Sequence, residues 1–89
     1  MILFLGWGAM QDNLRRLADL RKGQKAIISD GPEAKGLGLG LLEMGFVTQA
    51  ELEVLAEAPF GGDPILVRVH GTRVAIRRAD AASILVSLV

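Results

Sequence analysis

The chain has 89 residues, of which ten are basic and ten are acidic, and 51% of its residues are hydrophobic. This length supports one hydrophobic core, which excludes a multidomain enzyme. The balanced charge and the 4% aromatic content exclude the basic surface and the stacking side chains on which nucleic-acid binding depends, so we expect no nucleic-acid partner. The chain has no cysteine for a disulfide, and the single His70 leaves a zinc or iron site without a second imidazole.

The first ten residues are apolar, but they make up only half of the roughly 20 residues that cross a bilayer. They lack the basic start of a secretory signal, and polar sequence begins at Gln11. We therefore predict no membrane insertion. We expect an N-terminal extension over residues 1–13 and one folded domain over residues 14–89.

Five short runs of aliphatic and β-branched residues, at 24–29, 51–55, 65–69, 72–76 and 84–89, predict strands. Charged and aliphatic residues alternate from Glu51, so Glu51, Glu53 and Glu57 are expected to line the solvent face. His70 and Gly71 separate two runs at the spacing of a tight hairpin. The predicted fold is mostly β, a small five-stranded barrel. Its predicted core comprises Ile27, Leu52, Val54, Ile65, Val67, Val69, Val74, Ile76, Ile84 and Val86.

One helical segment is predicted over residues 33–44, between the first two strands, and Gly45 occupies a position suited to a left-handed C-cap. Helical spacing places Leu37, Leu41 and Met44 on one face, with a second aliphatic face nearly opposite. Because only one face can meet the barrel, we predict that Leu37, Leu41 and Met44 form an exposed stripe that binds a partner.

The same stripe can instead drive self-association into a homo-oligomer. A further alternative is that both faces of the helix are buried, with Phe4 and Trp7 of the N-terminal extension covering the outer one.

Other patterns carry less chemistry. The run from Gly36 to Gly40 departs from the dinucleotide fingerprint, whose third glycine falls one place later, so we interpret it as allowing close approach of another backbone. No nucleophile, base and orienting group converge, which predicts a protein that is not an enzyme. Arg68 and Arg77 belong to the one basic cluster, with Arg73 and Arg78, and form either a small patch for an acidic partner or an ordinary solvated strand face.

Several motifs together resemble the ferrous iron transport protein A (FeoA) family over residues 14–89. The most specific is Ala58-Pro-Phe-Gly-Gly-Asp-Pro-Ile65, lengthened here by one glycine, which precedes a strand ending in Arg77 and Arg78. The others are Leu17-Ala-Asp-Leu20-x-x-Gly23, Leu41-Leu-Glu-Met-Gly-Phe46, Glu51-Leu-Glu-Val54, Val69-x-Gly71 and Ile84-x-Val86. The chain departs from the family at Gly40, where an arginine is usual, and at Thr48 and Gln49, where Pro-Gly is usual.

The resemblance implies an SH3-like barrel with a helical insertion between strands 1 and 2, and no cofactor. It implies a non-enzymatic cytoplasmic accessory protein that binds the cytoplasmic GTPase-containing region of a membrane ferrous-iron transporter and modulates Fe(II) uptake. The alternative is a metal-responsive SH3-like regulatory module resembling the C-terminal domain of iron-dependent repressors. That alternative requires a DNA-binding partner domain.

Overall fold

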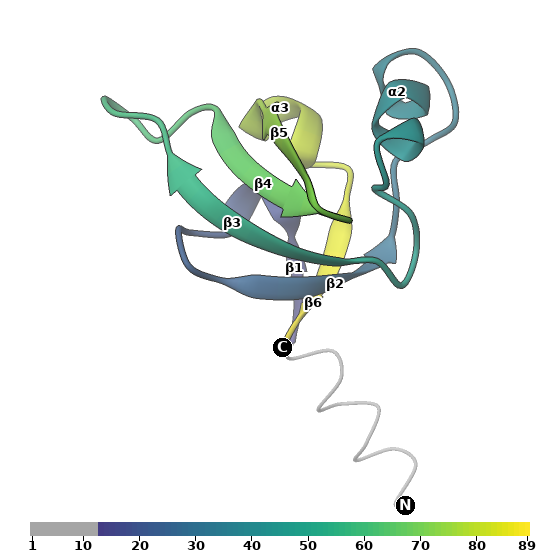
Figure 1. Ribbon diagram of the computed structural model, residues 1–89, viewed down its shortest axis with the longest axis horizontal. Coiled ribbons are helices and arrows are strands. Elements are labelled where there is room, and N and C mark those ends of the chain that lie inside the picture. The colour runs from purple at the N-terminus through teal and green to yellow at the C-terminus, as the bar shows by residue number, and fades with distance from the viewer. Residues whose placement is uncertain (1–12) are drawn as a thin grey trace, which may run out of the picture.

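The computed structural model describes residues 13–89. They form one antiparallel sheet with the strand order β1-β6-β2-β3-β4-β5, flanked by short helices (Figure 1). In chain order the elements are β1 (Leu14–Arg16), the 3-10 helix η1 (Leu17–Asp19), β2 (Lys25–Asp30), α2 (Leu37–Glu43), β3 (Glu51–Glu57), β4 (Ile65–Val69), β5 (Thr72–Ile76), α3 (Arg78–Ala81) and β6 (Leu85–Leu88). The predicted extension over residues 1–13, with Phe4 and Trp7, lies outside the described residues except for Asn13.

The sheet has six strands rather than the predicted five. β1 is the additional strand; its three residues are all exposed and pair antiparallel with β6. Such a strand has no buried face and therefore no alternating pattern in the sequence. β1 and β5 are the two edges of the sheet, so strand pairing does not close it into a complete barrel.

β4 and β5 have the predicted bounds and form the predicted hairpin. His70 and Gly71 at its tip have φ angles of 50° and 75°. Two consecutive residues with positive φ are typical of a type I′ turn, whose twist matches that of the flanking strands.

The core lies on one face of the sheet, and nine of the ten predicted core residues are buried. The exception is Ile27, which is half-buried, while its neighbours Ala26 and Ile28 are fully buried. Ile27 pairs with Glu51 and Ser87 on the outer face, so the prediction was wrong by one residue of register. The small side chain of Ala26 therefore lies in the core, whereas the larger side chain of Ile27 lies on the outer face.

α2 begins at Leu37, four residues later than predicted; it follows β2 and precedes β3 in the chain and lies to one side of the sheet (Figure 1). Its N-cap, Gly36, has a φ of 57° and a ψ of −134°, which is not helical backbone. A Cβ atom on Gly38 would lie 2.0 Å from the carbonyl oxygen of Glu33. Glycine at this position therefore lets the preceding loop cross close to the helix. This agrees with the interpretation that the glycine run allows close approach of another backbone.

Val67, at the centre of β4, is fully buried and pairs with Val54 on one side and Val74 on the other. We expect Val67→Ala to lower the free energy of unfolding by about 1–3 kcal/mol, from lost burial and the cavity left behind. Denaturant unfolding measures this loss. Thr72→Ala, an exposed change in the same hairpin, is the control, and a midpoint for Val67→Ala equal to that of the control would contradict the packing described here.

Candidate functional site

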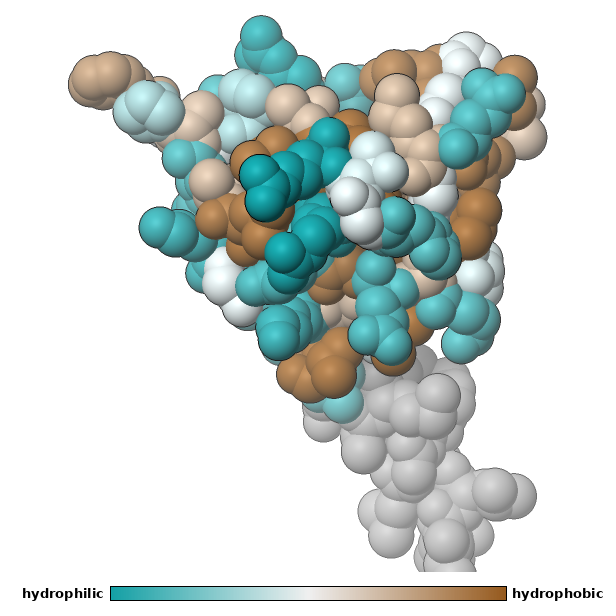
Figure 2. All heavy atoms as spheres, viewed as in Figure 1, coloured by the Kyte–Doolittle hydropathy of each residue, from teal (hydrophilic) through white to brown (hydrophobic). Residues whose placement is uncertain are grey.

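Large apolar side chains gather on α2 and on the turn that follows it. Leu37 is 57% exposed, Leu39 and Met44 are each 47% exposed, and Val47 is 40% exposed. We call these four residues the α2 apolar surface. Figure 2 shows hydrophobic residues clustered over α2, at the upper right of the molecule. Of the predicted stripe, Leu37 and Met44 belong to this surface, and Leu39 and Val47 were not predicted to belong to it.

Leu41, the third residue of the predicted stripe, is buried at 4% exposure and belongs to the core. The hydrogen bonds at the C-terminus of α2 explain why Leu41 is buried. The N–H of Phe46 donates to the carbonyl of Leu41 at 3.1 Å, and the N–H of Gly45 donates to that of Leu42 at 3.0 Å. These two bonds define a Schellman motif, in which the residues at the positions of Leu41 and Phe46 commonly make a hydrophobic contact. Phe46 is also fully buried in the core.

Gly45 does two things at this helix end. Its φ of 112° suits the left-handed position of the Schellman motif. A Cβ atom on Gly45 would lie only 2.7 Å from Cδ2 of His70, so the imidazole occupies the space that a side chain would need. The tip of the β4–β5 hairpin therefore packs against the end of α2 and helps to place the α2 apolar surface relative to the sheet.

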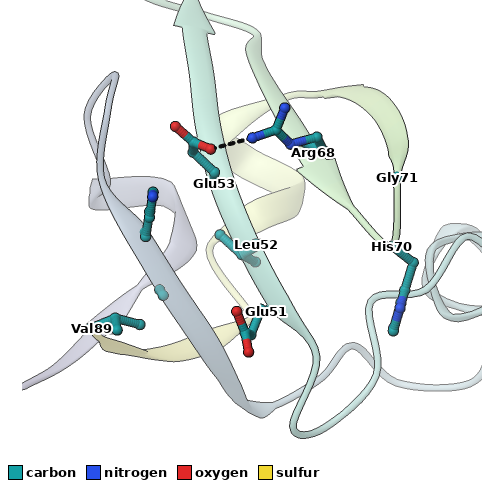
Figure 3. A pocket seen from close by; sticks show the side chains of 9 residues that line it. Glu51, Leu52, Glu53, Arg68, His70, Gly71 and Val89 are labelled. Carbon is teal, nitrogen blue, oxygen red and sulfur yellow. Dashed lines mark hydrogen bonds and ion pairs between the residues drawn. The ribbon is translucent and has the colours of Figure 1, made fainter.

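An open hollow of about 390 Å³ lies beside the hairpin, over β2, β3 and β4 (Figure 3). Within it Arg68 forms an ion pair with Glu53, drawn as a dashed line in Figure 3. Glu51 and His70 also line the hollow. Residues 13–89 contain no group of three His, Cys, Asp or Glu side chains placed to hold a metal ion.

Arg78 is the most highly connected side chain at the other end of the sheet. Its Nη1 donates to the carbonyls of Ala18 at 2.6 Å and Leu20 at 3.0 Å. Its Nε donates to the carbonyl of Gly62 at 2.9 Å, and its Nη2 to Oε1 of Glu57 at 2.8 Å. This group of hydrogen bonds, which we call the Arg78 clamp, joins the segment around η1 to the end of β3 and to the β3–β4 loop.

The position of Glu57 corrects the prediction that it lines the solvent face with Glu51 and Glu53. The register shifts by one between Val54 and Ala56, so Leu55 is an extra residue in β3, a β-bulge. Beyond the bulge Glu57 pairs with the buried Ile65. The bulge therefore turns the Glu57 side chain from the outer face toward Arg78.

Glu57 accepts further hydrogen bonds from the backbone N–H of Lys22, at 3.0 Å, and from Nη1 of Arg21, at 3.1 Å. The Lys22 N–H contributes most to lowering the pKa of Glu57 below its usual value, against partial burial, which raises it. The positive charges of Arg21 and Arg78 lower this pKa further. Glu57 is therefore held in its ionised form.

Residues 15–88 of the chain match the sequence model of the FeoA domain family. The chain belongs to the FeoA family. The crystal structure of an iron uptake regulatory protein (FeoA) is 28% identical to it, with a TM-score of 0.72, and the match covers 85% of this chain and 97% of that one. No curated protein sequence gives a significant match.

A zinc complex of FeoA from Stenotrophomonas maltophilia is 31% identical, with a TM-score of 0.69, over 80% of this chain and 87% of that one. It is described as a prokaryotic SH3 domain protein, so the six-stranded sheet of this chain is SH3-like. A manganese-dependent transcriptional repressor shares the fold, at 23% identity and a TM-score of 0.70, over 85% of this chain and 42% of that one. The predicted family and its association with ferrous iron transport are confirmed. Within residues 13–89, no helix has the length and apolar character to span a membrane.

Arg78→Lys tests the Arg78 clamp. A lysine ammonium has three donors at one point and cannot reproduce the planar fork that reaches Ala18, Gly62 and Glu57 together. We expect a loss of about 2 kcal/mol in the free energy of unfolding, measured by denaturant unfolding. The matched control is Arg77→Lys at the exposed neighbouring position, where we expect no measurable change. Equal stabilities of the two variants would show that Arg78 does not hold these segments together.

The lowered pKa of Glu57 predicts a pH dependence of stability. Its contribution is complete above the unfolded-state pKa of about 4.3 and is lost as the pH falls through the lower pKa of the folded state. Wild type should therefore be more stable than Glu57→Gln at pH 7, and the difference should shrink below about pH 4. Denaturant unfolding of both proteins from pH 3 to 7 measures this. A difference that stays constant over that range would contradict the assignment.

Proposed function

We propose that this FeoA protein is a non-enzymatic cytoplasmic accessory that binds the GTPase-containing cytoplasmic region of a membrane ferrous-iron transporter and modulates Fe(II) uptake. The observation that carries the proposal is the α2 apolar surface, on a helix inserted between two strands of the sheet. An apolar patch that a folded domain leaves exposed commonly marks an interaction site. Membership of the FeoA family identifies ferrous iron transport as the process.

The construction of α2 suits docking into a groove. Leu41 and Phe46 are buried in the core and hold the helix against it, while Leu37 and Met44, seven residues apart, remain exposed. Exposed residues separated by two helical turns are the anchors of the helix-in-groove mode of recognition. Because the Schellman motif and the contact with His70 already order the helix end, binding requires little further ordering of the chain.

A second candidate function is a metal-responsive regulatory module of the kind found in iron-dependent repressors. The likeness of fold to the manganese-dependent repressor favours it. In this case the partner is a DNA-binding protein, and association depends on a divalent metal. The α2 apolar surface gives no reason for such a metal dependence, so we place this candidate second.

Substitutions at exposed and at buried positions of α2 test the proposed docking surface. The double variant Leu37→Glu/Met44→Glu should stay folded, because both side chains are already largely exposed, and should bind the purified cytoplasmic region of the transporter at least tenfold more weakly. Circular dichroism and calorimetry measure folding and binding. Leu41→Glu should unfold the domain, since it places an unpaired charge in the core.

Ala34→Glu is the control, because it adds a charge at an exposed position near α2 but outside the apolar surface, and it should bind like wild type. Sedimentation velocity on the same variants tests the alternative of self-association. A homo-oligomer that disappears in Leu37→Glu/Met44→Glu, with no binding of the transporter region by wild type, would assign the surface to a second copy. Unchanged transporter binding by the double variant would refute this docking surface.

A further inference from the structure

The β5 strand offers an open edge of the sheet. It pairs with β4 from Thr72 to Ile76, and no strand within residues 13–89 pairs with its other side. The backbone N–H and C=O groups on an open edge can form a ladder with an additional strand. This edge therefore supplies the backbone part of a binding site for an extended peptide.

The exposed side chains of this edge follow a regular order. Arg73 and Ala75 are exposed and alternate with the buried Val74 and Ile76. Arg77 follows in extended backbone, with a φ of −68° and a ψ of 142°, and is also exposed. Residues two apart in a strand lie about 7 Å from one another on the same face. The edge thus presents a small residue between two arginines.

A shallow apolar hollow of about 280 Å³ adjoins Ala75. Its floor is a row of side chains in register across three strands, Ala56 of β3, Leu66 of β4 and Ala75 of β5. Pro59 and Pro64 of the β3–β4 loop also line it. Because two of the three floor residues are alanines, the hollow has room for one aliphatic side chain.

The charges around the hollow are unbalanced. Arg68 lies directly opposite Arg73 in the β4–β5 ladder and already pairs with Glu53 on its other side. Like charges opposite one another in a sheet are unfavourable. Within residues 13–89, the side chains of Arg73 and Arg77 have neither a hydrogen bond nor an ion pair. A carboxylate placed beside either of them gains a partner and offsets the repulsion at Arg73.

We propose that the β5 edge binds an extended segment of a partner protein in which an apolar residue is flanked, two positions away on each side, by acidic residues. The segment adds to β5 as a further strand. Its apolar side chain enters the hollow beside Ala75, and its two carboxylates pair with Arg73 and Arg77. This surface is separate from the α2 apolar surface and does not depend on the function proposed for it.

The test uses a fluorescein-labelled peptide, Ser-Thr-Glu-Val-Leu-Val-Glu-Thr-Ser, and a control peptide with lysine in place of both glutamates. Fluorescence anisotropy measures the affinity of the full chain, and amide NMR spectra locate the contact. We expect saturable binding of the acidic peptide alone, with shift changes and slower amide exchange concentrated in residues 72–77. Equal binding of the lysine peptide would overturn the proposal, as would shifts confined to α2.

Arg73→Gln/Arg77→Gln should weaken binding of the acidic peptide at least tenfold. The matched control is Arg15→Gln/Arg16→Gln, which removes the same charge at the opposite edge strand, β1, and should change the affinity less than twofold. Equal weakening by both pairs would reduce the effect to net charge and refute the site. Leu37→Glu/Met44→Glu should leave peptide binding unchanged. This result would show that peptide binding at β5 does not depend on the α2 apolar surface.

Two other roles for these arginines are outcomes that would overturn the proposal. Charged residues on an edge strand can serve only to prevent edge-to-edge aggregation. In that case wild type does not bind the acidic peptide, and Arg73→Gln/Arg77→Gln self-associates on sedimentation. Arginines can also bind phosphate groups, in which case a short single-stranded RNA displaces the peptide at a lower concentration than unlabelled peptide does.

Discussion

The guanidinium of Arg78 joins parts of the chain that the sheet itself does not connect. The carbonyls of Ala18 and Leu20 and the carboxylate of Glu57 all receive its hydrogen bonds, and Gly62 ties in the β3–β4 loop. The backbone N–H of Arg78 also donates to Asp63, at 2.9 Å. Arginine suits this role because its donors point in several fixed directions in one plane. Without it, carbonyl groups at this end of the sheet would lose their partners, and the loop would lose its support.

Sequence reasoning located five of the six strands of the sheet but not the edge strand β1. Inward-facing aliphatic residues recur at every second position in β4 and in β5 from Val74, and a residue pair suited to a type I′ turn joins the two strands, so local pattern was sufficient for them. β1 is a strand only because β6 lies beside it, a relation between residues about 70 positions apart. In β2 two isoleucines are adjacent, and alternation alone could not decide which of Ile27 and Ile28 points inward.

Helical spacing predicted only part of the candidate site, because the motif at the C-terminus of α2 also decides which side chains are buried. Leu37 and Met44 are exposed, as expected from helical spacing, whereas Leu41 lies on the same predicted face and is buried. Helical spacing predicts the buried face of a long helix better than that of a helix of about two turns. In such a short helix the C-terminal motif decides which side chain meets the core. The pair Gly45-Phe46 was the available signal, since a hydrophobic residue after the C-cap glycine selects Leu41 as its partner. Nothing local distinguished Arg78 from its neighbour Arg77, because its partners come from distant segments.

The bulge at Leu55 also determines where the chain tolerates changes of length. Before the bulge, odd-numbered residues of β3 face outward, and after it even-numbered residues do. Ala56 therefore lies on the floor of the apolar hollow, and Glu57 points toward Arg78. A shift of one residue in the pairing of β3 with β4 beyond the bulge would exchange these two side chains between the faces and remove both arrangements together. The β3–β4 loop follows the last paired residue of β3, so an additional glycine there lengthens the connection without altering the phase of either strand. A residue added in the loop therefore leaves both strands in phase, whereas an added residue that shifted the pairing of Ala56 and Glu57 would move them to the opposite faces.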